Sequence, residues 1–318
     1  MPPHSLSPHH AARVLEPVWP QATVAEVIAR TGGQLSTVYE VRCAEPATAV
    51  IVKIYDEQWR WKQAKEVHVY NLLDQHDVQS VPRILHTESG TATIGAAFTV
   101  MTVIPGQPLS QISADLDEAD RTRIYRRLGA DLAAIHRIQQ PDYGYITTEV
   151  IDPEPNNTAY MTRQFAKKLR EFRRLGGDPP LHEAIAGYVE RRVDRFAQCA
   201  VPVLCHNDFH EGNVLVRRGP DGFEVSGFID VENAIAADPL IDLAKTDYYA
   251  IGDNAGKRAG LLDGYGALPD DWPDRLLLYR LYHALELWDW FASIGNTPPL
   301  PGIAEDMRAL TRGDRSAG

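Results

Sequence analysis

Three polar residues in the second half of the chain have the types and the spacing that phosphoryl transfer requires. Asp208 and Asn213 lie five positions apart in the run Cys-His-Asn-Asp-Phe-His-Glu-Gly-Asn, and Asp230 follows an apolar segment. In phosphoryl transfer to a hydroxyl group, one carboxylate accepts or orients the hydroxyl proton. An amide oxygen and a second carboxylate hold the metal ions that neutralise the phosphates. An acid, an amide and a second acid in this order therefore favour a phosphotransferase.

The segments around these residues predict a loop, a strand, a turn and a second strand. Val214 begins a short apolar run, the turn-rich Arg-Arg-Gly-Pro-Asp-Gly follows, and a second apolar run ends before Asp230. Two alternatives to phosphoryl transfer remain open: a metal-hydrolase site made by His206, Asp208 and His210, and a polar turn with no chemistry. No second His or Cys cluster follows at ligand spacing, which favours phosphoryl transfer over the hydrolase.

Residues 20–105 are expected to supply the part of the protein that covers a nucleotide. Residues 37–43 alternate with a period of two, which predicts a strand. The segment Thr-Gly-Gly-Gln-Leu-Ser precedes it, and its glycines permit a tight loop from which backbone N–H groups and Ser36 can face phosphate oxygens. A plain hairpin turn is the alternative. A Walker-type phosphate loop is excluded, because no G-x-x-x-x-G-K-[ST] run occurs.

Lys53 lies in the middle of the β-branched run 49–55. A lysine there is costly unless its ammonium group has a partner, and nucleotide phosphates together with a glutamate on the next helix would be such partners. Residues 60–73 have helical spacing, and Glu66 is the best candidate for the ion pair, with Glu57 as the alternative. Otherwise Lys53 would extend from an edge strand into solvent. Further strands are predicted over 81–85 and 97–104, the latter ending at a Pro-Gly pair.

These motifs together resemble the aminoglycoside phosphotransferase and choline kinase superfamily, the small-molecule kinases that share the protein-kinase fold. The resemblance rests on His-x-Asp with Asn213 at the matching distance, on Ile-Asp-Val-Glu at the metal-binding position, and on Lys53, and it extends over nearly the whole chain. In many antibiotic kinases the residue after the histidine is glycine. This chain has Asn207, as choline kinases often do.

The resemblance implies a role for each of these residues. Asp208 would be the catalytic base, and Asn213 and Asp230 the Mg²⁺ ligands. The strand end near residues 102–106 would be a hinge that binds adenine through backbone groups. Lys53 would bind phosphates. The backbones of Thr102 and Ile104 would contact the adenine, with Met101 beside the ring. His206 would brace the catalytic loop, and Asp242 would form hydrogen bonds to the backbone of that loop. Asp238 is an alternative N-cap for the same helix as Asp242.

The fold that the resemblance implies is α+β, protein-kinase-like and two-lobed. Residues 1–104 would form a nucleotide-binding lobe with a five-stranded antiparallel sheet and one helix, and residues 105–318 a mainly helical catalytic and substrate-binding lobe. Apolar residues recur at helical spacing between Ile124 and Ile135, over 157–174 and over 181–198, which predicts helices there. The first ten residues are expected to be frayed.

The predicted reaction is ATP- and Mg²⁺-dependent phosphorylation of a hydroxyl group on a small molecule, with GTP as an alternative donor. An aminoglycoside or related antibiotic is the first choice of acceptor, which would confer resistance, and the alternative is a metabolic kinase of the choline or ethanolamine type. A pseudokinase scaffold is disfavoured, because the lysine, both acids and the asparagine are all present. In this superfamily C-terminal helices build the acceptor pocket, for which the candidates are Asp247, Glu286, Asp289 and Trp290.

Composition limits the class of protein and its partners. Charged residues make up 24% and hydrophobic residues 44% of the 318 residues, which is typical of a globular protein. The net charge of −11 argues against nucleic acid and suits a cationic small substrate. No apolar run approaches a membrane span, no signal-peptide pattern is seen, and the three cysteines lack metal or disulfide spacing. We therefore expect a cytoplasmic monomer or homodimer that does not bind membranes.

Overall fold

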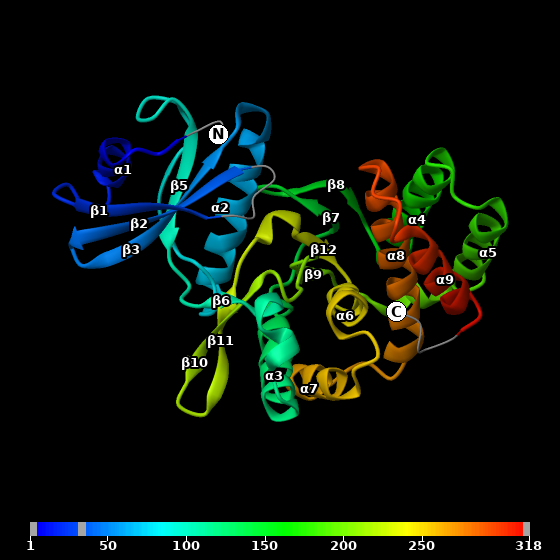
Figure 1. Cartoon of the computed structure of the whole chain (residues 1–318). Helices are drawn as coiled ribbons and strands as arrows, with labels where there is room; N and C mark the ends of the chain where they lie inside the picture. Colours follow the sequence, from blue (N-terminus) through cyan, green and yellow to red (C-terminus); the bar gives the residue numbers. More distant parts are fainter. Residues whose placement is uncertain (1–4, 31–35, 314–318) are drawn as a thin grey trace. The chain divides into compact units, whose positions relative to one another are not determined.

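In the computed structural model, which describes residues 5–30 and 36–313, the chain divides into two compact units. Unit 1 comprises Met1–Gln107, Thr147–Glu149 and Ser226–Glu232, and unit 2 comprises Pro108–Ile146, Val150–Val225 and Asn233–Gly318. Figure 1 follows the chain through both units from blue to red. The residues predicted to bind the nucleotide belong to unit 1, as does Asp230, while Asp208 and Asn213 belong to unit 2.

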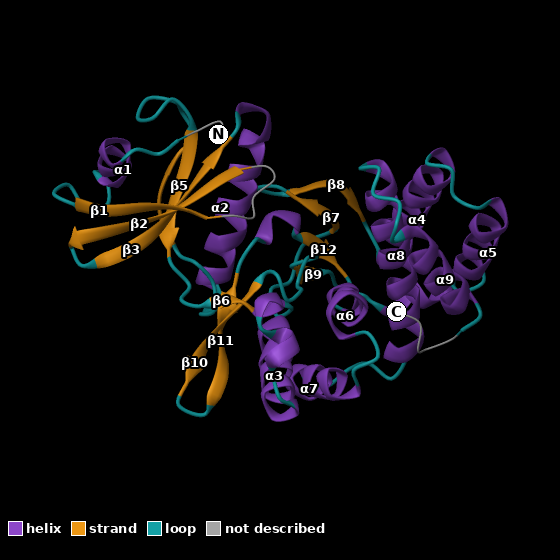
Figure 2. Ribbon diagram, viewed as in Figure 1, coloured by secondary structure: helices purple, strands orange, loops and turns teal. Residues whose placement is uncertain are grey.

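Unit 1 is built on a five-stranded antiparallel sheet in the order β1-β2-β3-β5-β4, and Figure 2 shows helix α2 beside these strands. The strands of this sheet are β1 (Thr23–Arg30), β2 (Ser36–Glu45), β3 (Thr48–Tyr55), β4 (Ile84–Glu88) and β5 (Ala97–Thr102), and its helices are α1 (Pro8–Leu15) and α2 (Arg60–Gln75).

Side chains along β3 point alternately to the two faces of the sheet, and this determines which of them contact α1 and which contact α2. Val52 and Ile54 point to one face, where they join a buried apolar cluster with Val14 and Leu15 of α1. Because successive side chains of a strand point to opposite faces, Lys53 lies on the other face, where α2 supplies its partner. The sheet thus keeps an apolar core on one side and delivers one lysine to a helix on the other.

Helix α1 corrects two expectations about the N-terminal region. The expectation of a single helix in this lobe is wrong, because α1 precedes α2. The expectation of a frayed N-terminus is also wrong from Pro8 onwards, where α1 begins. The Ser7 hydroxyl accepts a hydrogen bond from the His10 N–H, and proline is favoured in the first helical turn. Val14 and Leu15 then anchor the helix, since neither is exposed.

Two strands begin or end differently from the prediction. β4 starts at Ile84 rather than at residue 81, because Pro82 has no N–H for a strand ladder. β5 ends at Thr102 rather than at residue 104, three residues before Pro105, which has no N–H for a strand ladder. The sheet is otherwise the five-stranded antiparallel sheet expected from the sequence.

Unit 2 is mainly helical, and the expected α+β fold class is confirmed. Its helices are α3 (Glu118–Ile135), α4 (Asn157–Arg174), α5 (Pro179–Glu190), α6 (Leu240–Thr246), α7 (Ala255–Tyr265), α8 (Trp272–Ser293) and α9 (Leu300–Thr311). A four-stranded sheet in the order β8-β7-β12-β9 contains β7 (Tyr143–Ile146), β8 (Val150–Glu154), β9 (Val203–Cys205) and β12 (Ile235–Ala237). A third sheet, in the order β11-β10-β6, contains β6 (Gln107–Pro108), β10 (Val214–Gly219) and β11 (Gly222–Phe228), of which Gln107 and residues 226–228 are counted in unit 1.

The predicted helix over 157–174 is confirmed as α4, and the predicted strand-turn-strand as β10 and β11. The helix predicted over 181–198 is wrong at both ends. α5 starts earlier, at Pro179, because proline is suited to the first helical turn, and it stops at Glu190 before a short 3₁₀ segment, Val193–Gln198. None of the helices in the described parts of the chain is long and apolar enough to cross a membrane.

Helices α3 and α7 pack closely, and this packing supports the predicted catalytic loop. A Cβ atom at Gly129 of α3 would clash with the backbone of α7, and one at Gly264 of α7 would clash with the backbone of α3. The absence of side chains at these two positions therefore permits the close approach. As a result, His136 at the end of α3 and Tyr265 at the end of α7 lie within hydrogen-bonding distance of each other.

Candidate functional site

Lys53 on β3 is paired with Glu66 on α2. Its Nζ lies 2.9 Å from Glu66 Oε1 and 2.8 Å from Oε2, and the Tyr55 hydroxyl donates to the same carboxylate at 2.7 Å. Burial alone would lower the pKa of Lys53, but the nearby carboxylates of Glu66 and Asp230 raise it above its ordinary value. Lys53 is therefore charged, and Glu66 rather than Glu57 is its partner.

Asp230 follows β11 in an unusual backbone conformation. Its φ is +67°, a region that few residues other than glycine adopt, and its N–H donates to the Tyr70 hydroxyl at 3.1 Å. Gly227 lets the preceding residues run against the backbone of Ser80, because a Cβ atom there would clash with the Ser80 carbonyl. The segment that carries Asp230 is thus fixed within unit 1 from two sides.

Glu232, the last residue of this segment, links β3 to α2. Its carboxylate lies 3.0 Å from Lys62 Nζ and 3.8 Å from Lys53 Nζ. Lys53 therefore faces three carboxylates of unit 1, on Glu66, Glu232 and Asp230. A cationic group surrounded in this way suits a position where anionic phosphates and a metal ion bind together.

The other residues predicted to contact the nucleotide also belong to unit 1. Ser36 is the first residue of β2, whereas the glycine-containing segment 31–35 before it lies outside the described residues. Met101 is buried in β5, and the Thr102 N–H donates to the Arg83 carbonyl at 3.0 Å. Ile104 lies beyond the end of the strand.

The carboxylate of Asp208 is held by two side-chain amides of unit 2. Asn213 Nδ2 donates to the Asp208 carbonyl at 2.9 Å and lies 3.4 Å from Asp208 Oδ2. Asn233 Nδ2 donates to the same Oδ2 at 3.2 Å. The engagement of Asn213 Nδ2 fixes the orientation of its amide, so that the amide oxygen is turned away from the Asp208 carbonyl.

Asp242 fixes the backbone just before Asp208. Its Oδ2 accepts from the His206 N–H and its Oδ1 from the Asn207 N–H, both at 2.6 Å. The His136 ring contacts Oδ2 at 3.1 Å, and the Tyr265 hydroxyl contacts the other ring nitrogen at 2.9 Å. Burial alone would raise the pKa of Asp242, but the hydrogen bond and charge of His136 lower it. The carboxylate therefore bonds the loop as an anion.

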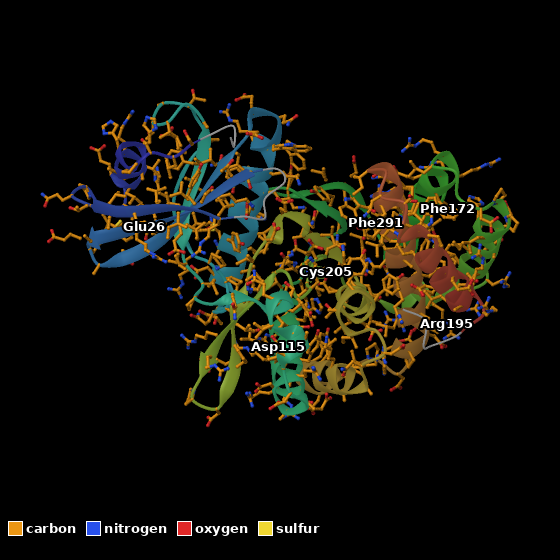
Figure 3. All side chains as sticks on the ribbon, in the orientation of Figure 1. Glu26, Asp115, Phe172, Arg195, Cys205 and Phe291 are labelled. Atoms are coloured by element: carbon orange, nitrogen blue, oxygen red, sulfur yellow. The ribbon has the colours of Figure 1, made fainter. Side chains whose placement is uncertain are left out.

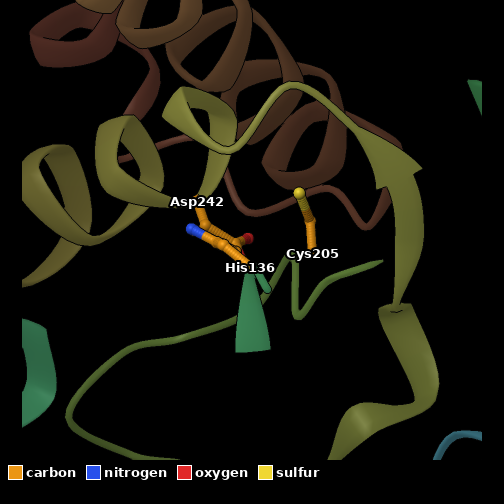
Figure 4. A group of neighbouring side chains, drawn as sticks. All are labelled: His136, Cys205 and Asp242. Carbon is orange, nitrogen blue, oxygen red and sulfur yellow. The ribbon is translucent and has the colours of Figure 1, made fainter. Parts of the chain in front are cut away.

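Figure 4 shows that Asp242, His136 and Cys205 lie together. Their potential ligand atoms are within 4.8 Å of one another, which is compatible with metal binding. However, Asp242 already accepts two backbone N–H groups, and burial raises the pKa of the Cys205 thiol, which disfavours the thiolate that a metal requires. The cluster is better understood as the support of the predicted catalytic loop, whose backbone Asp242 holds. Among the described residues, His206, Asp208 and His210 do not form such a group.

Asp238 lies close to the N-terminus of α6, but its role differs from that of Asp242. Its Oδ1 accepts from the Leu240 N–H at 2.9 Å, as an N-cap would, while its Oδ2 accepts from Arg275 and from the Tyr279 hydroxyl, both at 2.7 Å. Asp238 therefore ties the start of α6 to α8, and Asp242 contacts the loop.

Two of the carboxylates proposed for the acceptor pocket have partners within the protein. Asp247 is buried, and its oxygens lie 2.7 Å from Arg258 and 3.4 Å from Arg280. Glu286 Oε2 lies 3.3 Å from Lys245 Nζ and 3.3 Å from His283 Nδ1. Burial alone would raise the pKa of Glu286, but Lys245 and His283 lower it. A substrate amine would have to compete with these cations.

Asp289, one turn after Glu286 on α8, is in a different situation. It is 2% exposed, and neither of its carboxylate oxygens has a hydrogen-bond partner among the described residues. Burial raises its pKa to about 7; the charge of Lys168 opposes this shift, and the charges of Glu171 and Glu286 reinforce it. The next residue, Trp290, is 46% exposed. Figure 3 labels two aromatic residues of this region, Phe172 on α4 and Phe291 on α8.

The structure adds site residues that the sequence did not single out. Lys245 lies 3.7 Å from Asp208 Oδ1, and Asn233 donates to Oδ2. Lys245 could have been found, because it lies three residues after Asp242 and residues at this spacing share a helix face. His136 and Tyr265 could not, since no local pattern joins the ends of α3 and α7 to Asp242.

Several solved structures have the same fold at low sequence identity. A thermostable variant of aminoglycoside phosphotransferase APH(4)-Ia in complex with ADP and hygromycin B is 16% identical, with a TM-score of 0.69 over 96% of this chain and 98% of that one. The GDP complex of an aminoglycoside 2′-phosphotransferase-IIIa variant is 13% identical, with a TM-score of 0.65 over 97% and 98%. A candidate fructosamine-3-kinase from Haemophilus somnus is 14% identical, with a TM-score of 0.62 over 96% of both chains.

Sequence comparison gives the family. No curated protein matches the chain. The family model described as the phosphotransferase enzyme family matches residues 26–278, in agreement with the resemblance stated from the motifs. This match covers well over half of the 318 residues and includes Lys53, Asp208, Asn213 and Asp230. The chain therefore belongs to the phosphotransferase enzyme family.

Proposed function

We propose that this protein transfers the γ-phosphate of ATP, bound with Mg²⁺, to a hydroxyl group of an aminoglycoside or related antibiotic. The family supports phosphoryl transfer, and solved structures of the same fold hold ADP, AMP-PNP or GDP together with hygromycin B or kanamycin. GTP is the alternative donor. Phosphorylation adds charge and bulk at a hydroxyl that the drug uses to bind its target, which would cause resistance. The observation that carries the proposal is the carboxylate of Asp208, held by two amides in a braced loop.

Unit 1 would bind the nucleotide. Lys53, kept charged by Glu66, would contact the phosphates, and Ser36 with the backbone of the preceding loop would face them. The end of β5 would hold the adenine through the backbones of Thr102 and Ile104, with Met101 beside the ring. This division of roles is supported by the face of β3 on which Lys53 lies, opposite the apolar cluster that packs on α1.

Asn213 and Asp230 fit a role as Mg²⁺ ligands. Mg²⁺ prefers oxygen donors, and the two residues offer an amide oxygen and a carboxylate. The bond from Asn213 Nδ2 to the Asp208 carbonyl orients the amide with its oxygen on the opposite side, as a ligand role requires. When bound, the ion would neutralise charge on the phosphates. Asp208 would accept or orient the proton of the acceptor hydroxyl.

Helix α8 would recognise a positively charged acceptor. A buried carboxylate without a hydrogen-bond partner is costly, and an ammonium group of a substrate would remove this cost for Asp289. Glu286, one turn earlier, would bind a second amine in competition with Lys245. Trp290, which is half exposed, would contribute the face of its ring. We leave Asp247 out of the pocket, because two arginines already neutralise it.

A metabolic kinase of the choline or ethanolamine type is the second candidate. Its support is the exposed indole of Trp290 on the helix that carries Asp289, because aromatic faces bind quaternary ammonium groups by about 0.5–2 kcal/mol. In addition, one solved structure of the same fold is a candidate fructosamine-3-kinase, whose name does not refer to an antibiotic.

The test is ADP release from ATP and Mg²⁺ in the presence of aminoglycosides, other hydroxylated antibiotics, choline and ethanolamine. We expect release that depends on an aminoglycoside and that disappears in Asp208→Ala. Release with choline or ethanolamine alone would instead support the metabolic kinase. Release with none of these acceptors, or equal release from Asp208→Ala, would contradict the proposed function.

A further inference from the structure

Lys245 of α6 is a buried cation beside the predicted catalytic carboxylate. It is 6% exposed, and its Nζ donates to the Asn207 carbonyl at 2.7 Å. The same Nζ lies 3.3 Å from Glu286 Oε2 and 3.7 Å from Asp208 Oδ1. A buried ammonium group is costly unless it is paired and hydrogen-bonded, and all of the contacts named here are to the catalytic loop or to the helix proposed to bind the acceptor.

The carbonyl that Lys245 holds belongs to a strained residue. Asn207 has a φ of +58°, which costs energy for any residue with a side chain and persists only when the surroundings fix it. The Asn207 N–H is held by Asp242 at 2.6 Å, and its side chain donates to the Asn233 carbonyl at 3.2 Å. Lys245 holds the remaining polar group of this residue's backbone, its carbonyl.

The two oxygens of Asp208 face different groups. The amides of Asn213 and Asn233 lie at Oδ2, while Lys245 and His210 lie at Oδ1, each 3.7 Å away. Amides on one side and a fixed cation on the other define the plane of the carboxylate. Asp208 is therefore oriented through its backbone and through both of its oxygens.

We propose that Lys245 is a positioning residue for phosphoryl transfer. It fixes the strained backbone of Asn207 and the orientation of the Asp208 carboxylate, and Glu286 in turn pairs with the charge of Lys245. The proposal rests on the proposed function of Asp208. It gives Glu286 a second role, because an acceptor amine that pairs with Glu286 would compete with Lys245. Lys245 thus couples the acceptor pocket to the catalytic loop.

Lys257 offers a matched control, because its carboxylate partner is Glu211, which lies in the same loop three residues after Asp208. Its Nζ has the same kinds of neighbours, namely a carboxylate oxygen of Glu211 at 2.8 Å, the Ala250 carbonyl at 3.0 Å and the ring of Tyr125 at 5.2 Å. Lys245 likewise lies 5.3 Å from the ring of Tyr249. Lys257 is partly buried, with 13% of its side chain exposed. If paired lysines near this loop matter only for stability, Lys257→Met and Lys245→Met should have the same effects.

The kinetic test compares Lys245→Met, Lys245→Arg and Lys257→Met with an accepted substrate. We expect Lys245→Met to lower kcat about 100-fold while the KM for ATP stays within about threefold, because misplacing a catalytic group by about 1 Å costs this much. Lys245→Arg, which keeps the charge, should recover about tenfold. Equal kcat values for Lys245→Met and Lys257→Met, measured well below their melting temperatures, would overturn the proposal.

A second test does not depend on turnover. The His206 and Asn207 amides are hydrogen-bonded to Asp242, so their hydrogen exchange reports on the order of the loop. Lys245→Met should accelerate this exchange about tenfold and Lys257→Met should not, since a lost bond to a charged group weakens the loop locally. Unchanged exchange would refute positioning by Lys245. A wild-type protein that phosphorylates nothing but shows this difference would refute only the proposed function.

Discussion

At the scale of single residues, the left-handed backbone of Asn207 accounts for a difference between this chain and many antibiotic kinases, which resemblance alone left open. A φ of +58° is free of strain for glycine, and asparagine tolerates it better than most residues. Glycine and asparagine are therefore alternatives that satisfy one backbone requirement. The choice between them therefore says little about the acceptor, whose binding we assign to α8.

We predict that Asn207→Gly is less destabilising than Asn207→Ala by about 1 kcal/mol in urea unfolding. Both variants lose the amide, but only alanine retains a Cβ atom in the left-handed region. A matched pair at an ordinary position, such as Asn296, which lies outside the helices, provides the control. Equal stabilities at position 207 would show that the backbone relaxes to another conformation when the side-chain bond to Asn233 is lost.

Asp208→Ala should lower kcat by roughly 10²–10⁴-fold, as loss of a general base does, and should leave nucleotide affinity nearly unchanged. The affinity for the Mg²⁺ complex of a non-hydrolysable ATP analogue is measured by calorimetry. Turnover within a few-fold of wild type would remove Asp208 from the reaction.

The two proposed ligands of Mg²⁺ should differ in strength. Asp230→Asn should weaken binding of the Mg²⁺ analogue complex more than Asn213→Ala does, because a neutral amide cannot neutralise the ion as a carboxylate does. The same titration with EDTA in place of Mg²⁺ is the control, and the two variants should then match wild type. Unchanged affinity for Asp230→Asn with Mg²⁺ present would place the ion on other residues.

At the scale of elements, helix α8 carries a buried carboxyl group, Asp289, that lowers the stability of the folded protein in a pH-dependent way. The pKa of Asp289 is raised by burial from 3.8 to about 7, so the folded protein binds this proton more tightly than the unfolded chain does. Below pH 3.8, the pKa of this carboxyl in the unfolded chain, burial of Asp289 costs the least stability. The cost grows as the pH rises towards 7. The full penalty is on the order of 4 kcal/mol above pH 7.

Asp289→Asn should therefore be more stable than wild type at pH 8, and the difference should shrink as the pH falls towards 4. Denaturant unfolding at several pH values measures it. Glu57→Gln, at a side chain that is 81% exposed and pairs with Arg60, serves as the control and should show no such trend. A constant difference between Asp289→Asn and wild type would mean that the carboxylate is ionised in the folded protein at every pH tested.

Elements with a clear local signal are predictable, whereas helix ends and charge partners are less so. The amphipathic pattern of α4 and the turn between β10 and β11 indicate the correct elements. The prolines at the start of α1 and α5 suggest breaks, although proline also begins helices, so the sequence misses one helix and starts the other too late. Lys53 can be assigned a partner because a lysine in a β-branched strand requires one. Lys245 can be placed on the same helix face as Asp242, but its partners cannot be assigned, because they come from a loop and a helix about forty residues away on either side.

At the scale of the whole molecule, the net charge of −11 should assist capture of a polycationic acceptor. Raising the salt concentration from roughly 50 mM to 500 mM should lower kcat/KM for an aminoglycoside with several amines, because the screening length falls below about 10 Å. Ethanolamine, with a single charge, should show a weaker dependence if it is accepted. Equal salt dependence for both would mean that the overall charge does not steer the acceptor.

The three-part composition of unit 1 determines when this unit can be completed during synthesis. Met1–Gln107 emerges from the ribosome well before Ser226–Glu232, which supplies two of the carboxylates around Lys53. Proteins generally begin to fold from the N-terminus during synthesis. A nascent chain released before residue 226 would therefore carry the sheet and Lys53 without Asp230 and Glu232. We expect such a fragment to expose the face of β3 that carries Lys53 to chaperones rather than to bind nucleotide.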